Sequence, residues 1–429
     1  MAYSHPVFEV IFLLTVGILW SMIFYQLFFT FMGFLYRFRS HKEKQELDSG
    51  EEQELPPVSI LIPAHNEELV IVKTLESLCA LDYPSDRMEI IVINDGSRDA
   101  TAELVSKFAR KDSRVRVFNV PKEESAQGKS HALNLGLKET RHEIIAVYDA
   151  DNTPEPESLR YLVLNLIKNP KLASTFGKFR TRNRRKNLLT RCINLETLSF
   201  QFMIQAGRYL LFKTALLPGT NFVINKKALT ECGSWDEDAL TEDTELSIRL
   251  YQAGYEIKFV PYAVTWEEEP EQWGTWIRQR TRWVRGNFYI LRKYLLASFR
   301  LKKMSLIFEL VYLFLMYYLF LVSILLSHML FIFSGLGLIA VLSPGPYLAV
   351  WVCAILLFVA EIMITVSFEG EASFENLGVI LLMYFIYSQG WIVVVFRALY
   401  QEFTQKGMIK WEKTPRFASG WDPETPKKD

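Results

Sequence analysis

Residues 144–152 read Ile-Ile-Ala-Val-Tyr-Asp-Ala-Asp-Asn. A short apolar run that ends in two carboxylates predicts a buried strand with Asp149 and Asp151 at its carboxyl end. Hard divalent cations usually bind through one or two carboxylates together with substrate phosphates, so this strand end predicts a site for Mg²⁺ or Mn²⁺. Taken alone, two such acids more often belong to an exposed acidic loop, but their position directly after a buried strand favours a ligand.

The same pattern recurs on the N-terminal side of this stretch, where apolar runs alternate with helical ones. The expected strands are 58–62, 90–93 and 115–117, and the expected helices are 67–80, 100–110 and 130–138. Such alternation predicts an α/β layered fold with a largely parallel sheet. Ligands bind beyond the carboxyl ends of the strands in folds of this kind, and the polar motifs of this chain follow its strands.

Two strand ends carry candidate nucleotide contacts. Ala64, Asn66 and Glu67 follow the first strand, and Asp95 follows the second. We expect a cradle in which polar side chains read the nucleotide, with Gly96 allowing close approach of the backbone. The same residues allow a simpler explanation, in which Asn66 caps a helix and Asp-Gly forms a turn.

Charged groups stand at the starts of two expected helices. Lys129 is poorly placed for the dipole of its own helix, which a bound phosphate would explain, although an ordinary exposed lysine fits equally well. The run Thr241-Glu242-Asp243 begins an expected helix over 242–253, and Asp243 is a candidate general base for an acceptor hydroxyl. Thr241 as a helix cap, with acids in the first turn, is the alternative.

The composition indicates a protein with a soluble part and a membrane part. The chain is 50% hydrophobic yet 22% charged, which is too apolar for an ordinary soluble protein and too charged for one that is all membrane. A formal net charge of zero argues against a nucleic-acid partner. The spacing of the four cysteines predicts reduced thiols and a cytosolic soluble part. They are Cys79, Cys192, Cys232 and Cys353.

Apolar runs flank the central region. The run 7–36 exceeds the roughly 20 residues that span a bilayer, and the basic residues after it predict an uncleaved anchor that ends in the cytoplasm. Further runs are expected near 305–334, 346–368 and 376–397. The segment 305–342 is long enough for one tilted span or for a tight hairpin. Three crossings would place the C-terminus outside, whereas its basic residues favour the inside. We therefore expect one run to be a hairpin or to lie in the interface.

Residues 271–303 mix basic and aromatic side chains, which predicts a helical segment at the cytoplasmic surface of the membrane lipids. Gln279 and Arg282 are candidates to hold a diphosphate, because arginine suits bidentate phosphate contact. Trp283 offers a flat face to a sugar ring. Nucleic-acid binding is the competing explanation, and the adjoining membrane runs disfavour it.

The ordered set Asp95, Asp149 with Asp151, Asp243 and Gln279-Arg280-Thr281-Arg282-Trp283 resembles the family-2 processive glycosyltransferases. These include cellulose, chitin, hyaluronan and poly-N-acetylglucosamine synthases. The resemblance covers roughly residues 55–300 and extends in layout to the flanking membrane runs. It implies a GT-A fold and a single-displacement transfer with inversion at the sugar C1.

The resemblance also implies roles for the matching residues. Asp95 would bind uridine, Asp149 and Asp151 the UDP diphosphate and metal, and Asp243 would be the catalytic base. The residues implied near the diphosphate and the acceptor are Glu242, Gln279, Arg282, Trp283 and the loop Gly219-Thr220-Asn221, with a gating loop at Trp411–Arg416. The chain departs from the family pattern where Val284-Arg285-Gly286 replaces small residues, and in having one evident N-terminal span.

We expect a protein of the plasma membrane with five parts along the chain. They are a transmembrane anchor (1–40), a cytosolic GT-A domain (55–270), an interface segment (271–303), a transmembrane region (304–400) and a cytosolic tail (401–429).

The expected function is polymerisation of a sugar from a UDP-sugar, with UDP-N-acetylglucosamine as the first choice, into a β-linked polysaccharide that crosses the membrane. An accessory subunit would be a further partner. The alternative is a non-processive transferase that adds one sugar to a membrane lipid, which the small number of spans favours. A non-enzymatic sugar-nucleotide sensor or transporter is a third hypothesis, and the intact set of acids disfavours it.

Overall fold

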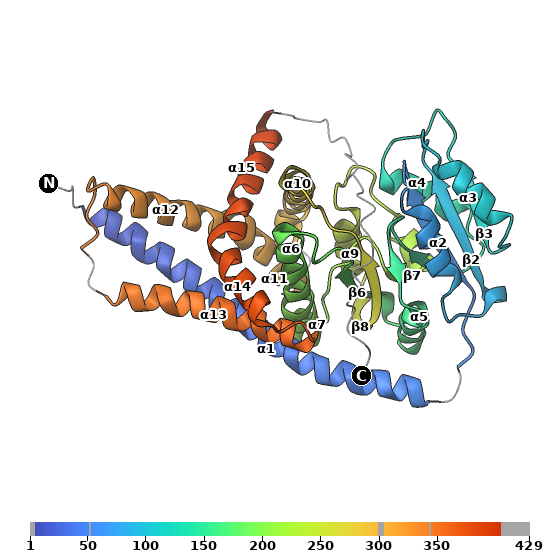
Figure 1. The fold of residues 1–429 in the computed structure, drawn as a ribbon, viewed down its shortest axis with the longest axis horizontal. Coiled ribbons are helices and arrows are strands. Elements are labelled where there is room, and N and C mark those ends of the chain that lie inside the picture. The colour runs from blue at the N-terminus through green and yellow to red at the C-terminus, as the bar shows by residue number, and fades with distance from the viewer. Residues whose placement is uncertain (1–4, 51–52, 299–303, 343–344, 405–429) are drawn as a thin grey trace.

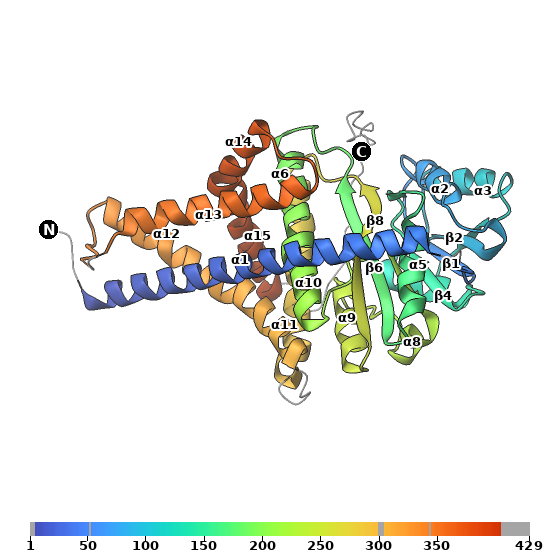
Figure 2. The same ribbon diagram turned by 90° about the horizontal axis from the view of Figure 1, so that it is seen from below.

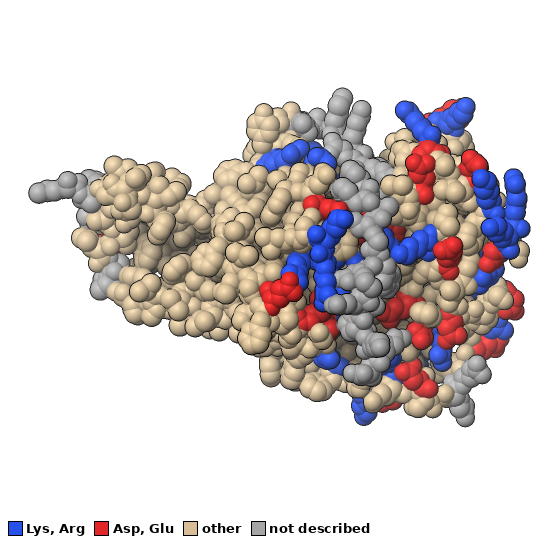
Figure 3. All heavy atoms as spheres, viewed as in Figure 1, with Lys and Arg blue, Asp and Glu red and all other residues tan. Residues whose placement is uncertain are grey.

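The computed structural model describes residues 5–50, 53–298, 304–342 and 345–404. It has two halves that lie end to end, one built on a β-sheet and one built of long apolar helices (Figure 1). On the face shown in Figure 3, the charged side chains of the described residues gather over the sheet half and its border, whereas the helical half shows an uncharged surface.

The sheet has eight strands in the order β3-β2-β1-β4-β7-β6-β8-β5. Their bounds are β1 (Val58–Ala64), β2 (Met88–Asn94), β3 (Val115–Asn119), β4 (Ile144–Val147), β5 (Thr153–Pro154), β6 (Leu172–Thr181), β7 (Phe222–Asn225) and β8 (Glu256–Glu267). The strands β1 to β4 are parallel, which confirms the predicted α/β fold. Strand β7 runs antiparallel to both β4 and β6, and this mixed part was not predicted.

Helices cover both faces of the sheet, which is why its central strands are mostly apolar. Ile60 and Ile62 of β1 belong to the hydrophobic core on one face of the sheet, and Leu61 belongs to the core on the other face. The helices on the first face are α2 (Ile71–Cys79), α3 (Thr101–Ala109) and α5 (Ser158–Lys168), and those on the second are α4 (Lys129–Lys138), α8 (Lys226–Glu231) and α9 (Glu242–Gln252).

The start of α2 differs from the sequence prediction. The helix was expected from residue 67 with Asn66 as a possible cap, but it begins at Ile71. Asn66 has a positive φ of 56°, and its Oδ1 accepts a hydrogen bond from the backbone N–H of Arg98 at 2.7 Å. The asparagine therefore joins the loops that follow β1 and β2, and it does not cap a helix.

One long helix, α1 (Pro6–Ser49), runs from the apolar half onto the sheet half (Figure 2). The polar residues that follow the apolar run continue the same helix as far as Ser49. Tyr161 of α5 donates a hydrogen bond to Asp48 Oδ1 at 2.7 Å, and Leu47 is buried in the core beneath the sheet. These contacts hold the polar end of α1 against the sheet half.

Four described helices are long and apolar enough to cross a membrane: Pro6–Ser49, Leu306–Gly335, Tyr347–Phe368 and Phe374–Thr404. The second comprises α11 (Met304–Phe314), η3 (Leu315–Phe320) and α12 (Leu321–Gly335), the third is α13 (Tyr347–Phe368), and the fourth comprises α14 (Phe374–Leu382), η4 (Met383–Tyr387) and α15 (Ser388–Thr404). Since Leu306–Gly335 is one unbroken helix, the tight hairpin considered for 305–342 is wrong.

Two further helical segments lie between the halves. One is the continuous run of α6 (Leu188–Ser199), η2 (Phe200–Gln205) and α7 (Ala206–Phe212), and the other is α10 (Trp273–Ser298). Both figures place them at the border between the sheet and the apolar helices. The expected interface segment 271–303 is therefore largely one helix.

The helix α14–α15 lies crosswise to α1, α12 and α13 in both views (Figures 1 and 2). Both of its ends carry ion pairs to the border helices. Glu375 at its start pairs with Arg191 of α6, and Glu402 near its end pairs with Arg292 of α10 at 2.6 Å. Both ends of α14–α15 therefore lie against the helices that border the sheet half.

The connection between α13 and α14 is anchored on the sheet by a buried carboxylate. Glu369 accepts a hydrogen bond from Lys178 Nζ at 2.8 Å and pairs with Arg180, both on β6. Burial alone would raise the pKa of Glu369, but the two cations hold it below its usual value. This end of α13 is thereby fixed on the same side as the sheet.

Candidate active site

Four predicted site residues meet at one point beyond the end of β4. The ammonium of Lys129 lies 2.6 Å from Asp149 Oδ1 and 3.7 Å from Glu242 Oε1. It also donates a hydrogen bond to the carbonyl oxygen of Gly219 at 2.9 Å. The start of α4, the end of β4, the loop before β7 and the start of α9 therefore converge as the strand-end rule predicts.

Asp243 belongs to the same cluster. A Cβ at Gly219 would lie 2.9 Å from Asp243 Oδ2 and 3.5 Å from Lys129 Nζ, and Gly219 has a φ of +79°, so the loop requires glycine here. Burial and the neighbouring carboxylate of Glu242 raise the pKa of Asp243 to about 7, while Lys129 opposes the shift. A carboxyl group with a pKa near neutrality suits general-base work.

The second acid of the pair, Asp151, is buried just past β4. The backbone N–H of Asp149 donates to Thr220 Oγ1 at 3.0 Å, and Thr220 in turn donates to Asn152, so the loop before β7 shapes this turn. No group of three or more His, Cys, Asp or Glu side chains among the described residues could hold a metal by itself. Two carboxylates that share a cation with a diphosphate match the usual Mg²⁺ arrangement, so the residues fit the implied metal.

The third residue of the predicted acceptor loop, Asn221, is placed elsewhere. Its side chain is fully buried, and its Nδ2 donates to the carbonyl oxygens of Ala263 at 3.1 Å and Lys178 at 3.2 Å. The amide therefore joins β6 to β8 within the sheet half. Only Gly219 and Thr220 of this loop reach the acids.

The residues predicted to form a nucleotide cradle lie together where β1 and β2 end side by side. Asp95 is buried, and its Oδ1 accepts a hydrogen bond from the backbone N–H of Ala126 at 2.6 Å. The N–H of Asp95 donates to the carbonyl of Ala64, the last residue of β1, at 2.9 Å. Glu67 is also buried, and its backbone N–H donates to Thr101 at 2.8 Å. Ala126, from the loop before α4, is a contact that the sequence did not indicate.

Helix α10 presents Gln279, Arg282 and Trp283. The indole of Trp283 is 38% exposed, and the guanidinium of Arg280 lies 3.9 Å from the centre of its ring. Arg280 also donates to Gln279 Oε1 at 3.1 Å. Arg280 was not singled out in the sequence, yet it orders two of the motif's side chains through a cation–π contact and a hydrogen bond.

The carboxylate of Glu196 on α6 connects this motif to the crosswise helix. It accepts hydrogen bonds from Arg280 at 3.0 Å, from Tyr387 at 2.8 Å and from the indole of Trp391 at 2.9 Å. The sequence signal for Glu196 was a lone acid within an apolar helix. Its three partners lie far along the chain, so the sequence did not identify them.

Helix α10 also packs directly on the start of α9. A Cβ at Gly286 would lie 2.5 Å from Thr241 Oγ1, so the two helices approach as closely as a glycine permits. Thr241 occupies the position before α9, but its side chain makes no capping hydrogen bond, so the predicted cap is wrong. Farther along, Lys293 of α10 donates to the buried carboxylate of Glu245 at 2.8 Å.

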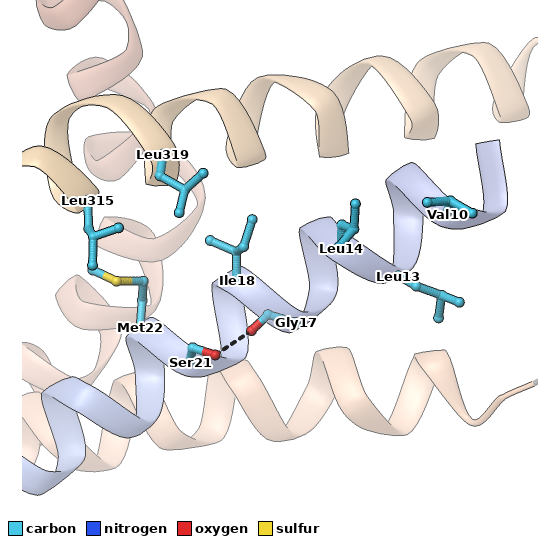
Figure 4. Close-up of a pocket in the computed structure, with 9 residues that line it drawn as sticks. All are labelled: Val10, Leu13, Leu14, Gly17, Ile18, Ser21, Met22, Leu315 and Leu319. Carbon is cyan, nitrogen blue, oxygen red and sulfur yellow. Dashed lines mark hydrogen bonds between the residues drawn. The ribbon is translucent and has the colours of Figure 1, made fainter. Parts of the chain in front are cut away.

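An apolar groove of about 570 Å³ lies between α1 and η3 (Figure 4). Its lining includes Leu14, Ile18 and Leu315. The hydroxyl of Ser21 donates a hydrogen bond to the carbonyl oxygen of Gly17 at 2.7 Å. A groove so lined offers nothing to a nucleotide. The predicted gating loop at Trp411–Arg416 lies outside the described residues.

This arrangement of acids at the strand ends of a mixed α/β sheet, with a basic aromatic helix beside them, is that of a glycosyltransferase. A family model described as "Glycosyltransferase like family 2" matches residues 56–286. The chain belongs to glycosyltransferase family 2.

Similar proteins agree with this assignment. The chain is 43% identical over 418 residues to "Probable glycosyltransferase YdaM" of Bacillus subtilis (strain 168), covering 95% of this chain and 98% of the relative. It is 32% identical over 291 residues to a poly-beta-1,6-N-acetyl-D-glucosamine synthase of Staphylococcus epidermidis, covering 66% of this chain and 69% of that protein.

A solved structure supports the fold. The mannosyltransferase PcManGT from Pyrobaculum calidifontis, in complex with GDP-Man and Mn²⁺, matches with a TM-score of 0.59 and 17% identity, covering 92% of this chain and 99% of that one. The catalytic half thus has a GT-A-like fold, accompanied by one N-terminal and three C-terminal apolar helices.

We predict that Gly286→Ala lowers both the melting temperature and the transfer rate, because the new methyl group would push α10 away from Thr241. Alanine normally favours a helix over glycine by about 1 kcal/mol, so a loss has to come from this clash. Gly378→Ala on α14 is the matched control, since nothing lies within 4 Å of its added Cβ. Wild-type melting and activity in Gly286→Ala would show that the helices are not in tight contact.

Proposed function

We propose that the chain is a membrane-bound inverting glycosyltransferase that polymerises sugar from a UDP-sugar into a β-linked polysaccharide and moves the product across the membrane. The observation that carries this proposal is the convergence of Lys129, Asp149 and Asp243 around Gly219, beside the helix that bears Trp283. One region at the border of the two halves thus contains the acids proposed for donor and acceptor chemistry. The same region contains the proposed platform for a sugar ring.

In the proposed reaction, Asp95 and its neighbours hold the nucleoside while Lys129 and Arg282 bind the diphosphate. A divalent cation at Asp149 and Asp151 would supply charge neutralisation to the leaving diphosphate. Asp243 accepts the proton of the acceptor hydroxyl, whose oxygen attacks the sugar C1 as the bond to the diphosphate breaks. Attack opposite the leaving group inverts the configuration at C1.

The identity of the sugar is proposed from likeness to named relatives. The Staphylococcus epidermidis protein with 32% identity is a poly-beta-1,6-N-acetyl-D-glucosamine synthase, so UDP-N-acetylglucosamine is the proposed donor. The platform at Trp283 supports repeated transfer, because an extending chain needs a surface on which its end rests.

Single transfer to a membrane lipid is the second candidate, and the membrane helices favour it. With α14–α15 lying crosswise, the described helices α1, α11–α12 and α13 are those that extend away from the sheet. A bundle this small offers few helices to enclose a polysaccharide, whereas a lipid acceptor needs only access from the inner leaflet.

The deciding experiment measures UDP release and product length with purified protein and a panel of UDP-sugars. We expect UDP-N-acetylglucosamine to be used, and products of many sugars on mass spectrometry. EDTA should stop transfer and Mg²⁺ or Mn²⁺ should restore it, because the diphosphate leaves with charge that the two aspartates cannot neutralise. Products one sugar longer than a lipid acceptor would establish the second candidate, and full activity in EDTA would remove the metal.

Replacing Asp243 tests the general base. Asp243→Asn should lower the transfer rate by roughly 10²–10⁴-fold while UDP binding is kept. Because the pKa of Asp243 is raised to about 7, the wild-type rate should fall as the pH drops below about 7 and protonates the base. Asp238→Asn, at an exposed acid nearby, is the control. A pH-independent rate between 6 and 8, together with an active Asp243→Asn variant, would contradict the assignment.

Trp283→Ala tests the acceptor platform. Loss of the ring that packs on the acceptor should reduce polymer formation by about 10²-fold, since small displacements of reacting groups cost that much, while UDP binding persists. Trp273, on the same helix and 41% exposed, is the matched control for a simple membrane anchor. If both variants keep their specific activity per folded molecule, Trp283 has no part in the site.

We also propose that α1, α11–α12 and α13 cross the membrane with the catalytic half in the cytosol, while α14–α15 lies along the cytoplasmic interface. The ion pairs at both ends of α14–α15 support this topology, and so does the fixed end of α13 at Glu369. It also places the basic C-terminal segment inside, as the charge bias requires.

Reporter fusions measure this topology. Green fluorescent protein at the C-terminus should fluoresce and alkaline phosphatase there should be inactive, because both would be cytosolic. Alkaline phosphatase fused after Leu342, in the connection between α12 and α13, should be active outside. An active phosphatase at the C-terminus would mean that α14–α15 crosses the membrane.

A further inference from the structure

Lys129 holds an unusual position in this site. Its side chain is only 16% exposed, and its ammonium bonds Asp149 at 2.6 Å while lying 3.7 Å from Glu242. A Cβ at Gly219 would touch both Asp243 Oδ2 and Lys129 Nζ, so the third carboxylate converges on the same point. One cation therefore stands among three acids.

These charges depend on one another. The ammonium of Lys129 lies 2.6 Å from Asp149 and 3.7 Å from Glu242, and carboxylates this close favour the charged form of the lysine. Without that cation, neighbouring carboxylates in a partly dry site would repel one another. Lys129 thus keeps the acids close together while the donor is absent.

The helix start adds a second reason for the contact. Lys129 is the first residue of α4, where the partial positive charge of the helix end opposes a cation. The ammonium is therefore stable here only with anions beside it. The neighbouring acids fill that role, and the diphosphate of a donor is the other anion that could.

We propose that Lys129 is the resident counter-ion of the donor site, which competes with a bare divalent cation for Asp149 and releases Asp149 to the cation when a diphosphate arrives. The inference rests on the proposed function in one respect, that Asp149 is a ligand of the donor's cation. The cation should consequently bind weakly alone and strongly together with a nucleoside diphosphate.

The experiment measures Mn²⁺ binding to the full-length protein in detergent by the electron paramagnetic resonance signal of free Mn²⁺, with and without UDP. Lys129→Met removes the charge at similar length, and Lys129→Gln is a second variant that keeps a donor for the Gly219 carbonyl. Without UDP, both should bind Mn²⁺ roughly tenfold or more tightly than wild type, because a competing unit charge is gone. With UDP, both should bind it more weakly than wild type.

Controls separate the possible results. Lys129→Arg keeps the charge and should bind Mn²⁺ alone as weakly as wild type does. Lys122→Met, at an exposed lysine upstream in the same loop, should also bind Mn²⁺ as wild type does. Folded Lys129→Met and Lys129→Gln proteins that bind Mn²⁺ alone no more tightly than wild type would overturn the proposal. Tighter Mn²⁺ binding in the variants, with no UDP binding by wild type, would support the counter-ion role and count instead against the proposed donor.

Discussion

The close contact between α10 and the start of α9 is the constraint on which the rest of the site depends. Gly286 allows α10 to lie against Thr241, two residues before Asp243. Lys293 and Tyr294 of α10 then reach the buried carboxylate of Glu245 on α9. Because Asp243 and Trp283 stand on different helices, this packing helps to set the distance between the proposed base and the proposed acceptor platform.

The apolar helices are connected to the same unit by buried charges. Glu196 gathers Arg280 together with Tyr387 and Trp391 of the crosswise helix, and Glu369 joins the end of α13 to β6. Such buried ionic contacts are expensive to desolvate, so they contribute geometric specificity more than stability. Through Glu196, α14–α15 is therefore connected to the motif Gln279–Trp283.

The sequence predicted the parts of the fold whose pattern is local. The strands β1, β2 and β4 are mostly apolar and are followed by polar motifs, so these strands and a polar site beyond their ends were predicted. The role of Asn66 could not be predicted, because a loop contact with Arg98 outweighs its tendency to cap a helix. Glu196 and Gly286 act through partners distant in the chain, and only the three-dimensional packing identifies them. The orientation of α14–α15 was likewise left open, since its composition equals that of a crossing helix.

A double-mutant cycle on transfer rate tests the central claim that the contact between Thr241 and Gly286 sets the site. Thr241→Ala removes the two atoms nearest to a Cβ at position 286 and leaves only its own Cβ at 3.0 Å. If the contact is the constraint, adding Thr241→Ala to Gly286→Ala restores the rate to that of Thr241→Ala alone, a strong positive coupling between neighbours. Independent, additive losses from the two substitutions would contradict the account.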